Sequence, residues 1–207
     1  MFFTLAIIVL YIPFMILYPT RVIGKENYKK GKMIATSNHF SLKDPLILIC
    51  RFGTKFRFMA KKELYKNKFL GWILRHLKTI PVDRENPSPT TYKQVLSDLK
   101  NDKAVFIFPE GTRRKSGDEK VSDVKEGIIT FASKGDVKIV PMLFYRKPRI
   151  FRKNYIIVGE PIKIEGENPK KLTKEEKDAN LKRYVDAMKK LSIKLDEYVN
   201  KKKKKSK

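Results

Sequence analysis

Residues 104–113 read Ala-Val-Phe-Ile-Phe-Pro-Glu-Gly-Thr-Arg, an uninterrupted apolar run that passes directly into a proline and polar residues. An apolar run of this length is typical of a central strand that is buried on both faces. In open α/β sheets, ligands bind outside the carboxyl ends of such strands. The stretch therefore predicts an α/β fold with candidate ligand-binding residues directly after the strand. These residues are Glu110, Gly111, Thr112 and Arg113.

The residue types after this strand have distinct physical uses. Gly111 lets a ligand approach the backbone closely. The planar guanidinium of Arg113 matches a phosphate with two parallel hydrogen bonds, which a lysine cannot do. Glu110 can hold that arginine, or a hydroxyl group, in position. Taken alone, the same residues also fit a charged turn after a strand.

A second stretch, residues 36–45, contains His39 with Asp44 five residues later and Pro45 next. Aspartate is a favoured N-cap and proline is favoured at the first helical position, so we expect a helix to begin here, after His39. The two side chains can then meet, whereas within one helix they would point about 140° apart. A carboxylate fixes the tautomer of a histidine and stabilises its charged form, which predicts a catalytic pair. The alternative is that Asp44 only caps the helix and that His39 is a polar loop residue.

Apolar runs and alternating patterns predict further strands at residues 33–35, 56–60, 79–82, 137–145 and 155–162. Apolar residues at helical spacing predict helices near residues 46–50, 61–76, 90–101, 124–135 and 173–199. The last of these begins with the capping-box pattern Thr173-Lys174-Glu175-Glu176. Strands that alternate with helices predict a mixed central sheet wrapped by helices.

The N-terminal residues 1–19 carry no charged side chain. As a helix they would reach about 28 Å, close to the hydrocarbon core of a bilayer of about 30 Å. We therefore predict a membrane-anchoring segment at residues 1–20, a single folded domain at 21–200 and a basic tail at 201–207. Whether the segment spans the membrane, lies in one leaflet or is a buried core helix stays open. A spanning segment would place the basic remainder at the cytoplasmic face of the cell membrane.

The charge balance restricts the partners. With 47 Lys and Arg against 22 Asp and Glu, the net charge of +25 implies an anionic partner, which can be nucleic acid, an anionic membrane surface or an acidic carrier protein. The basic runs lack the interleaved aromatics of a single-strand nucleic-acid platform, and an uncharged N-terminus has no place in such a module. The single cysteine, Cys50, excludes an internal disulfide and is expected in the core, and no Cys/His cluster predicts a metal site.

Four blocks of the sequence, in order between Arg21 and Gly159, resemble those of the glycerolipid acyltransferases, in particular the 1-acyl-sn-glycerol-3-phosphate acyltransferases. The blocks are Asn38-His39 with Asp44-Pro45 (the HX4D motif), residues 60–64 with 71–72 and 82–84, residues 108–113, and Val140-Pro141. One departure is visible in the second block, where Lys68 replaces a proline that is common in the family.

The resemblance implies a transferase that moves a fatty acyl group from acyl-CoA or acyl carrier protein to the sn-2 hydroxyl of 1-acylglycerol-3-phosphate, giving phosphatidic acid. It implies His39 as general base and Asp44 as its support, with no cofactor besides the acyl thioester and no metal. The residues implied in substrate binding are Asn38, Lys61, Lys62, Arg84, Glu110, Gly111, Thr112 and Arg113. Three alternatives stay open: glycerol-3-phosphate or another lysophospholipid as acceptor, a non-catalytic lipid-binding scaffold, and a basic nucleic-acid-binding module.

Overall fold

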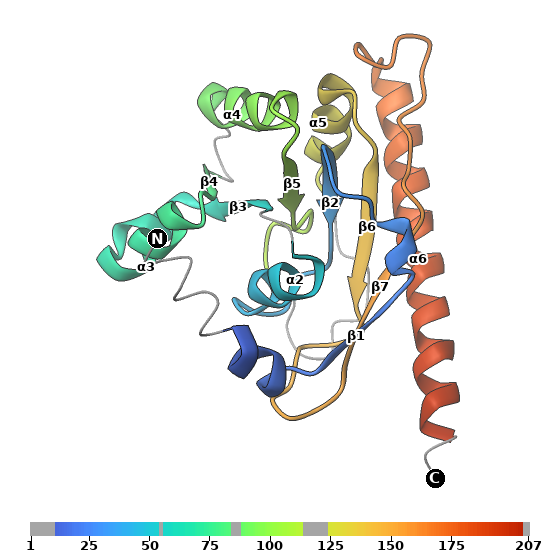
Figure 1. Ribbon diagram of the computed structural model, residues 1–207. Helices are drawn as coiled ribbons and strands as arrows, with labels where there is room; N and C mark the ends of the chain where they lie inside the picture. Colours follow the sequence, from blue (N-terminus) through green and yellow to red (C-terminus); the bar gives the residue numbers. More distant parts are fainter. Residues whose placement is uncertain (1–10, 54–55, 84–87, 114–123, 205–207) are drawn as a thin grey trace.

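A computed structural model describes residues 11–53, 56–83, 88–113 and 124–204 of the 207-residue chain (Figure 1). Its centre is a seven-stranded sheet of order β1-β7-β6-β2-β5-β3-β4. The strands are β1 (Thr20–Ile23), β2 (Met33–Thr36), β3 (Arg57–Lys61), β4 (Ile80–Val82), β5 (Ala104–Ile107), β6 (Ile139–Phe144) and β7 (Asn154–Val158). Only β6 and β7 pair antiparallel, so the predicted mixed sheet is confirmed.

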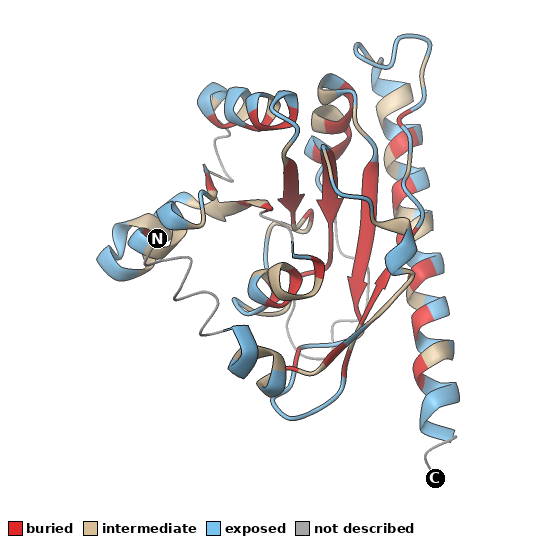
Figure 2. Ribbon diagram, in the orientation of Figure 1, coloured by how far each residue is buried: buried red, intermediate tan, exposed pale blue. Residues whose placement is uncertain are grey.

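Helices cover both faces of this sheet. They are α2 (Asp44–Phe52), α3 (Lys68–His76), α4 (Pro89–Lys100), α5 (Gly127–Gly135) and α6 (Lys174–Lys204), with the 3-10 helices η1 (Lys25–Asn27) and η2 (Lys62–Lys66). Successive side chains of a strand point to opposite faces, and β2 accordingly divides the core. Ile34 packs in the cluster that α4, α5 and α6 form, whereas Ala35 packs in the cluster of α2. All residues of β2, β5 and β6 are buried, as Figure 2 shows, which confirms the predicted central strand.

The helix predicted over residues 61–76 is wrong in one respect, because the structure divides it into η2 and α3. Asn67 causes the break, since its Oδ1 accepts a hydrogen bond from the backbone N–H of Leu70 at 2.9 Å and caps α3. The chain then folds tightly back on itself. A Cβ added at Gly71 would lie 2.6 Å from the carbonyl oxygen of Tyr65, so this position requires glycine.

The predicted membrane-anchoring helix has no support in the described part of the chain. Residues 1–10 lie outside the described residues, and residues 11–17 are helical. Across the ranges described, no helix combines the length and the apolar character needed to cross a bilayer. Tyr18 and Thr20 are buried in the α/β domain, with 4% and 8% of their surface exposed. At the other end, α6 continues through the lysines of the predicted tail as far as Lys204.

One edge of the sheet collects the candidate residues. The strands β2, β3, β4, β5 and β6 run parallel, so their carboxyl ends meet at the same edge. In Figure 1 the arrowheads of β2, β5 and β6 all point toward this edge, with α2 beside it and the helical residues 11–17 beyond it. His39 follows β2, residues 108–113 follow β5, and Lys62 follows β3.

Candidate active site

The predicted pair of His39 and Asp44 is formed. The imidazole Nδ1 lies 2.9 Å from the carboxylate Oδ2 of Asp44. The side chain of Asp44 is fully buried, and His39 has 8% of its surface exposed. Low exposure removes competing water, so the hydrogen bond is stronger than it would be at the surface.

The turn between the two residues shapes this pair. Asp44 Oδ2 also accepts hydrogen bonds from the backbone N–H groups of Phe40, at 2.7 Å, and Ser41, at 2.8 Å. The imidazole Nδ1 and two backbone N–H groups thus converge on one carboxylate oxygen. An ionised carboxylate only accepts, so the proton of the neutral imidazole is on Nδ1 and Nε2 keeps its lone pair. The arrangement therefore leaves His39 able to take a proton at Nε2.

The expected helix start was wrong by one residue. Asp44 was expected as the N-cap and Pro45 as the first helical residue, but α2 begins at Asp44 itself, with Lys43 as N-cap. The carboxylate of Asp44 turns back onto the preceding loop instead of capping its own helix. Because that loop carries His39, the same carboxylate both closes the turn and orients the imidazole.

An aromatic ring supports the imidazole from the next strand. The rings of His39 and Phe108 stack with centroids 4.0 Å apart and planes inclined by 22°. Phe108 directly follows β5, which neighbours β2 in the sheet. The sequence assigned Phe108 to the strand and gave no indication of this contact, which depends on how the two strands pair.

Asn38, a predicted substrate-binding residue, holds the end of a neighbouring strand. It is buried, and its amide forms two hydrogen bonds with the backbone of Phe144 at the end of β6. Nδ2 donates to the carbonyl oxygen at 2.9 Å, and Oδ1 accepts from the N–H at 2.8 Å. The amide of Asn38 thus forms the two hydrogen bonds that the backbone of a neighbouring strand would otherwise form with Phe144, because β2 has already ended. These bonds also fix the backbone beside His39. Contact of Asn38 with substrate stays a prediction.

The segment after β5 forms a tight turn. The N–H of Gly111 donates to the carbonyl oxygen of Phe108 at 3.1 Å, and Gly111 adopts a φ of 69°, which favours glycine. Thr112 and Arg113 are exposed and Glu110 is half-buried. Lys125, which the sequence reasoning missed, lies against this turn, since a Cβ added at Gly111 would be 3.4 Å from its Cε.

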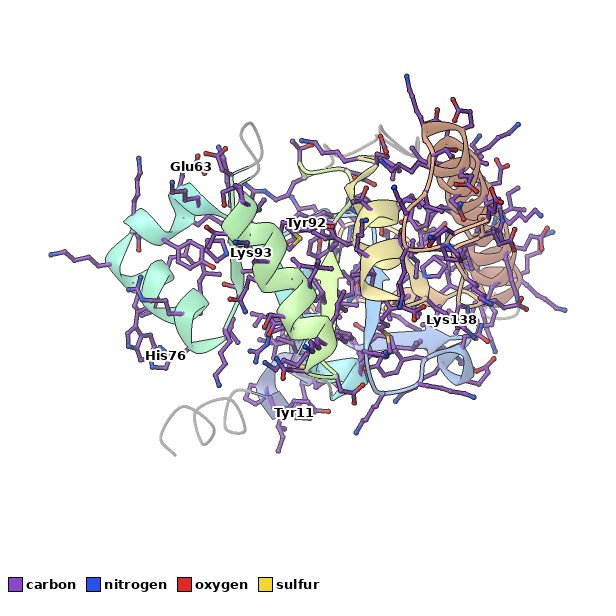
Figure 3. The ribbon with its side chains drawn as sticks, turned by 90° about the horizontal axis from the view of Figure 1, so that it is seen from above. Tyr11, Glu63, His76, Tyr92, Lys93 and Lys138 are labelled. Carbon is purple, nitrogen blue, oxygen red and sulfur yellow. The ribbon has the colours of Figure 1, made fainter. Side chains whose placement is uncertain are left out.

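A cavity of about 460 Å³ opens beside this turn. Its wall runs from Phe108 and Gly111 at the strand end to α4 and α5, and it is mostly apolar. Tyr92 of α4 and Phe131 of α5 pack against each other in this wall with ring centroids 5.4 Å apart, and Figure 3 shows Tyr92 on the side of α4 that faces α5. Phe108 lines this cavity and also stacks on His39, so a single aromatic ring lies between the histidine and the cavity.

The remaining predicted basic residues lie farther along the same edge. Lys61 ends β3 and pairs with Glu63 at 3.6 Å, and Lys62 begins η2 and is exposed. Arg84 lies outside the described residues. Asp83, just before it, lines the cavity. The structure thus brings His39, Asp44 and the 108–111 turn into contact, and it places Lys61 at the end of β3, two strands from β2.

The structure also bears on the single cysteine and on metal binding. Burial raises the pKa of the Cys50 thiol, while the nearby Arg51 lowers it by a smaller amount. In the described ranges, no group of three or more His, Cys, Asp or Glu side chains is arranged to hold a metal ion.

Known proteins resemble this chain in sequence. Residues 19–145 match the family model described as Acyltransferase. The 1-acyl-sn-glycerol-3-phosphate acyltransferase of Bacillus subtilis is 39% identical over 111 residues, which cover 51% of this chain and 53% of that protein. The protein of the same name from Borreliella burgdorferi is 34% identical over 138 residues, covering 65% of this chain and 54% of that one.

A solved structure has the same fold. The crystal structure of the 1-acyl-sn-glycerophosphate (LPA) acyltransferase PlsC from Thermotoga maritima aligns with a TM-score of 0.62 and 28% identity, over 86% of this chain and 71% of that one. The matches cover about half the length of the two curated relatives described above. The family model matches more than half of the chain and includes every residue of the HX4D motif. The chain therefore belongs to the Acyltransferase family.

Proposed function

We propose that this protein is an O-acyltransferase that moves a fatty acyl group from a thioester to the sn-2 hydroxyl of 1-acylglycerol-3-phosphate, giving phosphatidic acid for phospholipid synthesis. The observation that carries the proposal is the buried His39–Asp44 pair at the carboxyl edge of the sheet, which Phe108 joins to an apolar cavity. The names of the matched relatives and of the solved structure support the same reaction and acceptor.

In the proposed mechanism, His39 Nε2 removes the proton from the acceptor hydroxyl as its oxygen attacks the thioester carbonyl carbon. A new ester C–O bond forms, the C–S bond breaks, and the leaving thiolate takes up the proton from His39, which regenerates the base. Asp44 stabilises the imidazolium that forms in between. The acceptor alcohol is itself the nucleophile, so the reaction needs no thiol or hydroxyl group of the protein. The raised pKa of Cys50 agrees with this, because it disfavours the nucleophilic thiolate.

The apolar cavity is the proposed site of a fatty acyl chain. Its volume of about 460 Å³ lies within the range of small-molecule pockets. Burial of a chain there would stabilise the complex by roughly 0.8 kcal/mol per methylene group. Phe108 lies between the cavity and His39, and the carbonyl end of the acyl chain is proposed to leave the cavity past this ring and to lie next to the histidine.

The acceptor phosphate is proposed to bind at the turn after β5. Gly111 leaves the backbone open to a close approach, Arg113 offers two parallel hydrogen bonds, and Lys125 adds a second positive charge beside Gly111. Lys61, Lys62 and Arg84 are proposed as further phosphate ligands. The donor is either acyl-CoA or acyl carrier protein, because both are anionic and the chain carries +25.

The location follows from the acceptor. A lysophospholipid resides in a bilayer, and we propose that the protein works at the cytoplasmic face of the cell membrane, with residues 1–20 as an anchor. The lack of charge in residues 1–19 supports this part of the proposal. No metal and no further cofactor enter the proposed reaction, and nucleic acid is not a proposed partner.

An acceptor panel tests the function. Purified protein is supplied with either thioester donor and with lysophosphatidic acid, glycerol-3-phosphate or lysophosphatidylcholine, and the products are identified by mass. The proposal expects phosphatidic acid as the main product. Arg113→Ala should lower kcat/KM for lysophosphatidic acid about ten- to a hundredfold, because a charged hydrogen bond contributes about 1.5–3 kcal/mol. Faster acylation of either other acceptor would refute the proposed substrate, and no acylation of any would refute the reaction.

A further inference from the structure

The loop between β6 and β7 presents an unusual surface next to the active site. Its tip residues Ile150 and Phe151 are exposed at 48% and 71%. The loop has five exposed cationic residues and no acidic residue between positions 145 and 153. These cationic residues are Arg146, Lys147, Arg149, Arg152 and Lys153. Exposed apolar side chains within a cationic ring are a combination that suits an anionic, partly apolar partner.

The loop is held rigidly in this form. Phe151 has a φ of 54°, a left-handed conformation that a bulky residue rarely adopts. Its N–H donates to the carbonyl oxygen of Leu17 at 2.8 Å. Buried Asn154 accepts from the N–H of Arg149 at 2.9 Å and donates to the carbonyl oxygens of Arg149 and Arg152 at 3.1 and 2.9 Å. These hydrogen bonds hold the backbone around the tip, so the loop conformation itself keeps the side chain of Phe151 exposed.

Other exposed apolar residues lie on neighbouring elements. The helical residues 11–17 contact the loop through Leu17, and they contact α2 through Tyr11, whose hydroxyl donates to the carbonyl oxygen of Cys50 at 3.0 Å. Four residues of these elements and of the turn before α2 are exposed by 40–64%. They are Ile12, Ile16, Leu42 and Leu46. We call these four residues, together with Ile150 and Phe151, the apolar rim.

The apolar rim and the active site share one edge of the molecule. The loop begins at Tyr145, directly after Phe144, whose backbone holds Asn38 beside His39. Lys203, near the end of α6, lies over the ring of Tyr145 at 5.9 Å from its centroid. In Figure 1 the loop, the helical residues 11–17 and the C-terminal end of α6 all lie at the end of the molecule toward which β2 and β6 point. Figure 2 shows this loop as exposed.

We propose that the β6–β7 loop docks on the surface of an anionic bilayer, where Ile150 and Phe151 enter the interface and the surrounding cations contact lipid phosphates. An aromatic ring at the level of the headgroups is favourable, and each Lys or Arg near an anionic surface adds attraction. Docking through this edge turns His39 toward the bilayer. This inference rests on the proposed function in one respect, because the acceptor is then a molecule of that bilayer.

The first test measures binding of the full chain to vesicles of phosphatidylcholine with and without phosphatidylglycerol. Phe151→Asn keeps a residue that tolerates the left-handed conformation, and it should lower the partition constant about tenfold on anionic vesicles. The matched control is Ile193→Ser, on α6, where the side chain is 60% exposed but lies outside the rim. Equal losses for the two variants would overturn the proposal.

The charge of the loop is tested by Arg149→Gln combined with Arg152→Gln. Each neutralised cation should weaken binding to anionic vesicles about fivefold, so the double variant should lose about twenty-fivefold there and little on phosphatidylcholine alone. The control neutralises Lys134 and Lys138, two exposed lysines at the opposite edge of the sheet (Figure 3 labels Lys138). An equal loss in this control would mean that only net charge matters and would contradict a docking loop.

Insertion is read from a tryptophan at the tip. Phe151→Trp in a Trp72→Phe background has a single indole, because Trp72 is the only tryptophan of the chain. Its emission should be that of an exposed indole in buffer and should shift to the blue, with quenching by brominated lipid, when anionic vesicles are added. An unchanged spectrum on bound protein would refute insertion, and blue emission without vesicles would show that the protein itself covers the ring.

Turnover separates this proposal from the proposed function. Phe151→Asn should keep its rate on a short-chain acceptor dispersed as monomers and lose about tenfold on acceptor embedded in vesicles. Loss on both acceptors would contradict a docking role. Vesicle binding and tryptophan emission involve no acyl transfer, so they support or refute the docking surface even where the acceptor panel refutes the proposed reaction.

Discussion

Replacement of Asp44 by Asn is the most informative single change, because it keeps the shape of the side chain and removes its charge. Asp44 Oδ2 accepts three hydrogen bonds, from His39 Nδ1 and from the N–H groups of Phe40 and Ser41. A hydrogen bond to a charged group contributes about 1.5–3 kcal/mol and a neutral one about 0.5–1.5 kcal/mol. The loss of charge therefore costs about 1 kcal/mol per bond, or about 3 kcal/mol for the three.

The second consequence of this substitution falls on the other oxygen. Asp44 Oδ1 is buried and receives no hydrogen bond from any residue in the described ranges. With the Asn oxygen at the Oδ2 position, the new NH₂ group would lie where Oδ1 is and would add a desolvation cost of about 1–3 kcal/mol. With the amide flipped, the NH₂ group would face three donors. Either orientation weakens the fixed tautomer of His39.

Catalysis should suffer more than folding. Without the carboxylate, the imidazolium of His39 loses its counter-charge, and kcat should fall about 10²–10⁴-fold, the range of a general base. KM should change little, because Asp44 is fully buried and lies behind His39. The assay is steady-state acyl transfer to lysophosphatidic acid, with unfolding in urea measured on the same preparation.

The matched control is Asp98→Asn. Asp98 is also buried, with 3% of its surface exposed, and pairs with Lys103 at 2.9 Å, far from His39. This variant should lose stability and keep kcat within about threefold. A folded Asp44→Asn protein with a near-normal kcat would refute the role given to the carboxylate, and so would a loss confined to KM.

Three further changes test other parts of the structure. Asn38→Ala leaves the backbone N–H and carbonyl of Phe144 without their partners, so urea unfolding should show a loss of about 3 kcal/mol; a loss under about 1 kcal/mol would contradict this contact. Burial raises the pKa of Cys50, so less of its thiol is ionised at pH 8. Iodoacetamide should therefore alkylate Cys50 far more slowly in folded than in urea-unfolded protein, and the Cys50→Ser variant should keep its acyl transfer. Equal alkylation rates or an inactive variant would overturn this expectation. Hydrogen bonds from the backbone of Thr173, and then of Glu167, lower the pKa of Glu176, so its contribution is present above the ordinary carboxyl pKa and lost as pH falls through the lowered value. Melting temperatures of the parent protein and Glu176→Gln should therefore differ at pH 7 and converge at acidic pH, and an unchanged difference would disprove the capping role.

Local patterns predicted the elements that depend on neighbouring residues. The run 104–108 was identified as a buried central strand because both of its faces are apolar, and β5 confirms it. The spacing of His39 and Asp44 allows them to pair, because His39 lies before the helix, but it leaves a plain helix cap at Asp44 as the alternative; the structure shows the pair. The capping box at Thr173 also depends only on neighbouring residues, and it is confirmed by the hydrogen bond that the N–H of Glu176 donates to Thr173 Oγ1 at 3.2 Å.

Contacts between distant segments were not predictable in this way. Asn38 meets Phe144 and His39 meets Phe108 only because β2 lies between β5 and β6, and no local pattern encodes that order. The break before α3 was not predicted, because the apolar pattern over residues 61–76 gives no sign that Asn67 caps a new helix. Arg84 and residues 1–10 lie outside the described residues, so their predicted roles stay predictions.

The most direct test of the central claim compares acyl transfer by His39→Ala with that of His76→Ala. His76 is the second of the two histidines, is exposed on α3 and is bonded through Nδ1 to the carbonyl oxygen of Trp72. With saturating thioester and lysophosphatidic acid, kcat of His39→Ala should fall about 10²–10⁴-fold, with urea unfolding still cooperative, while His76→Ala keeps its kcat. A folded His39→Ala protein that retains kcat within about threefold of the parent would contradict the account.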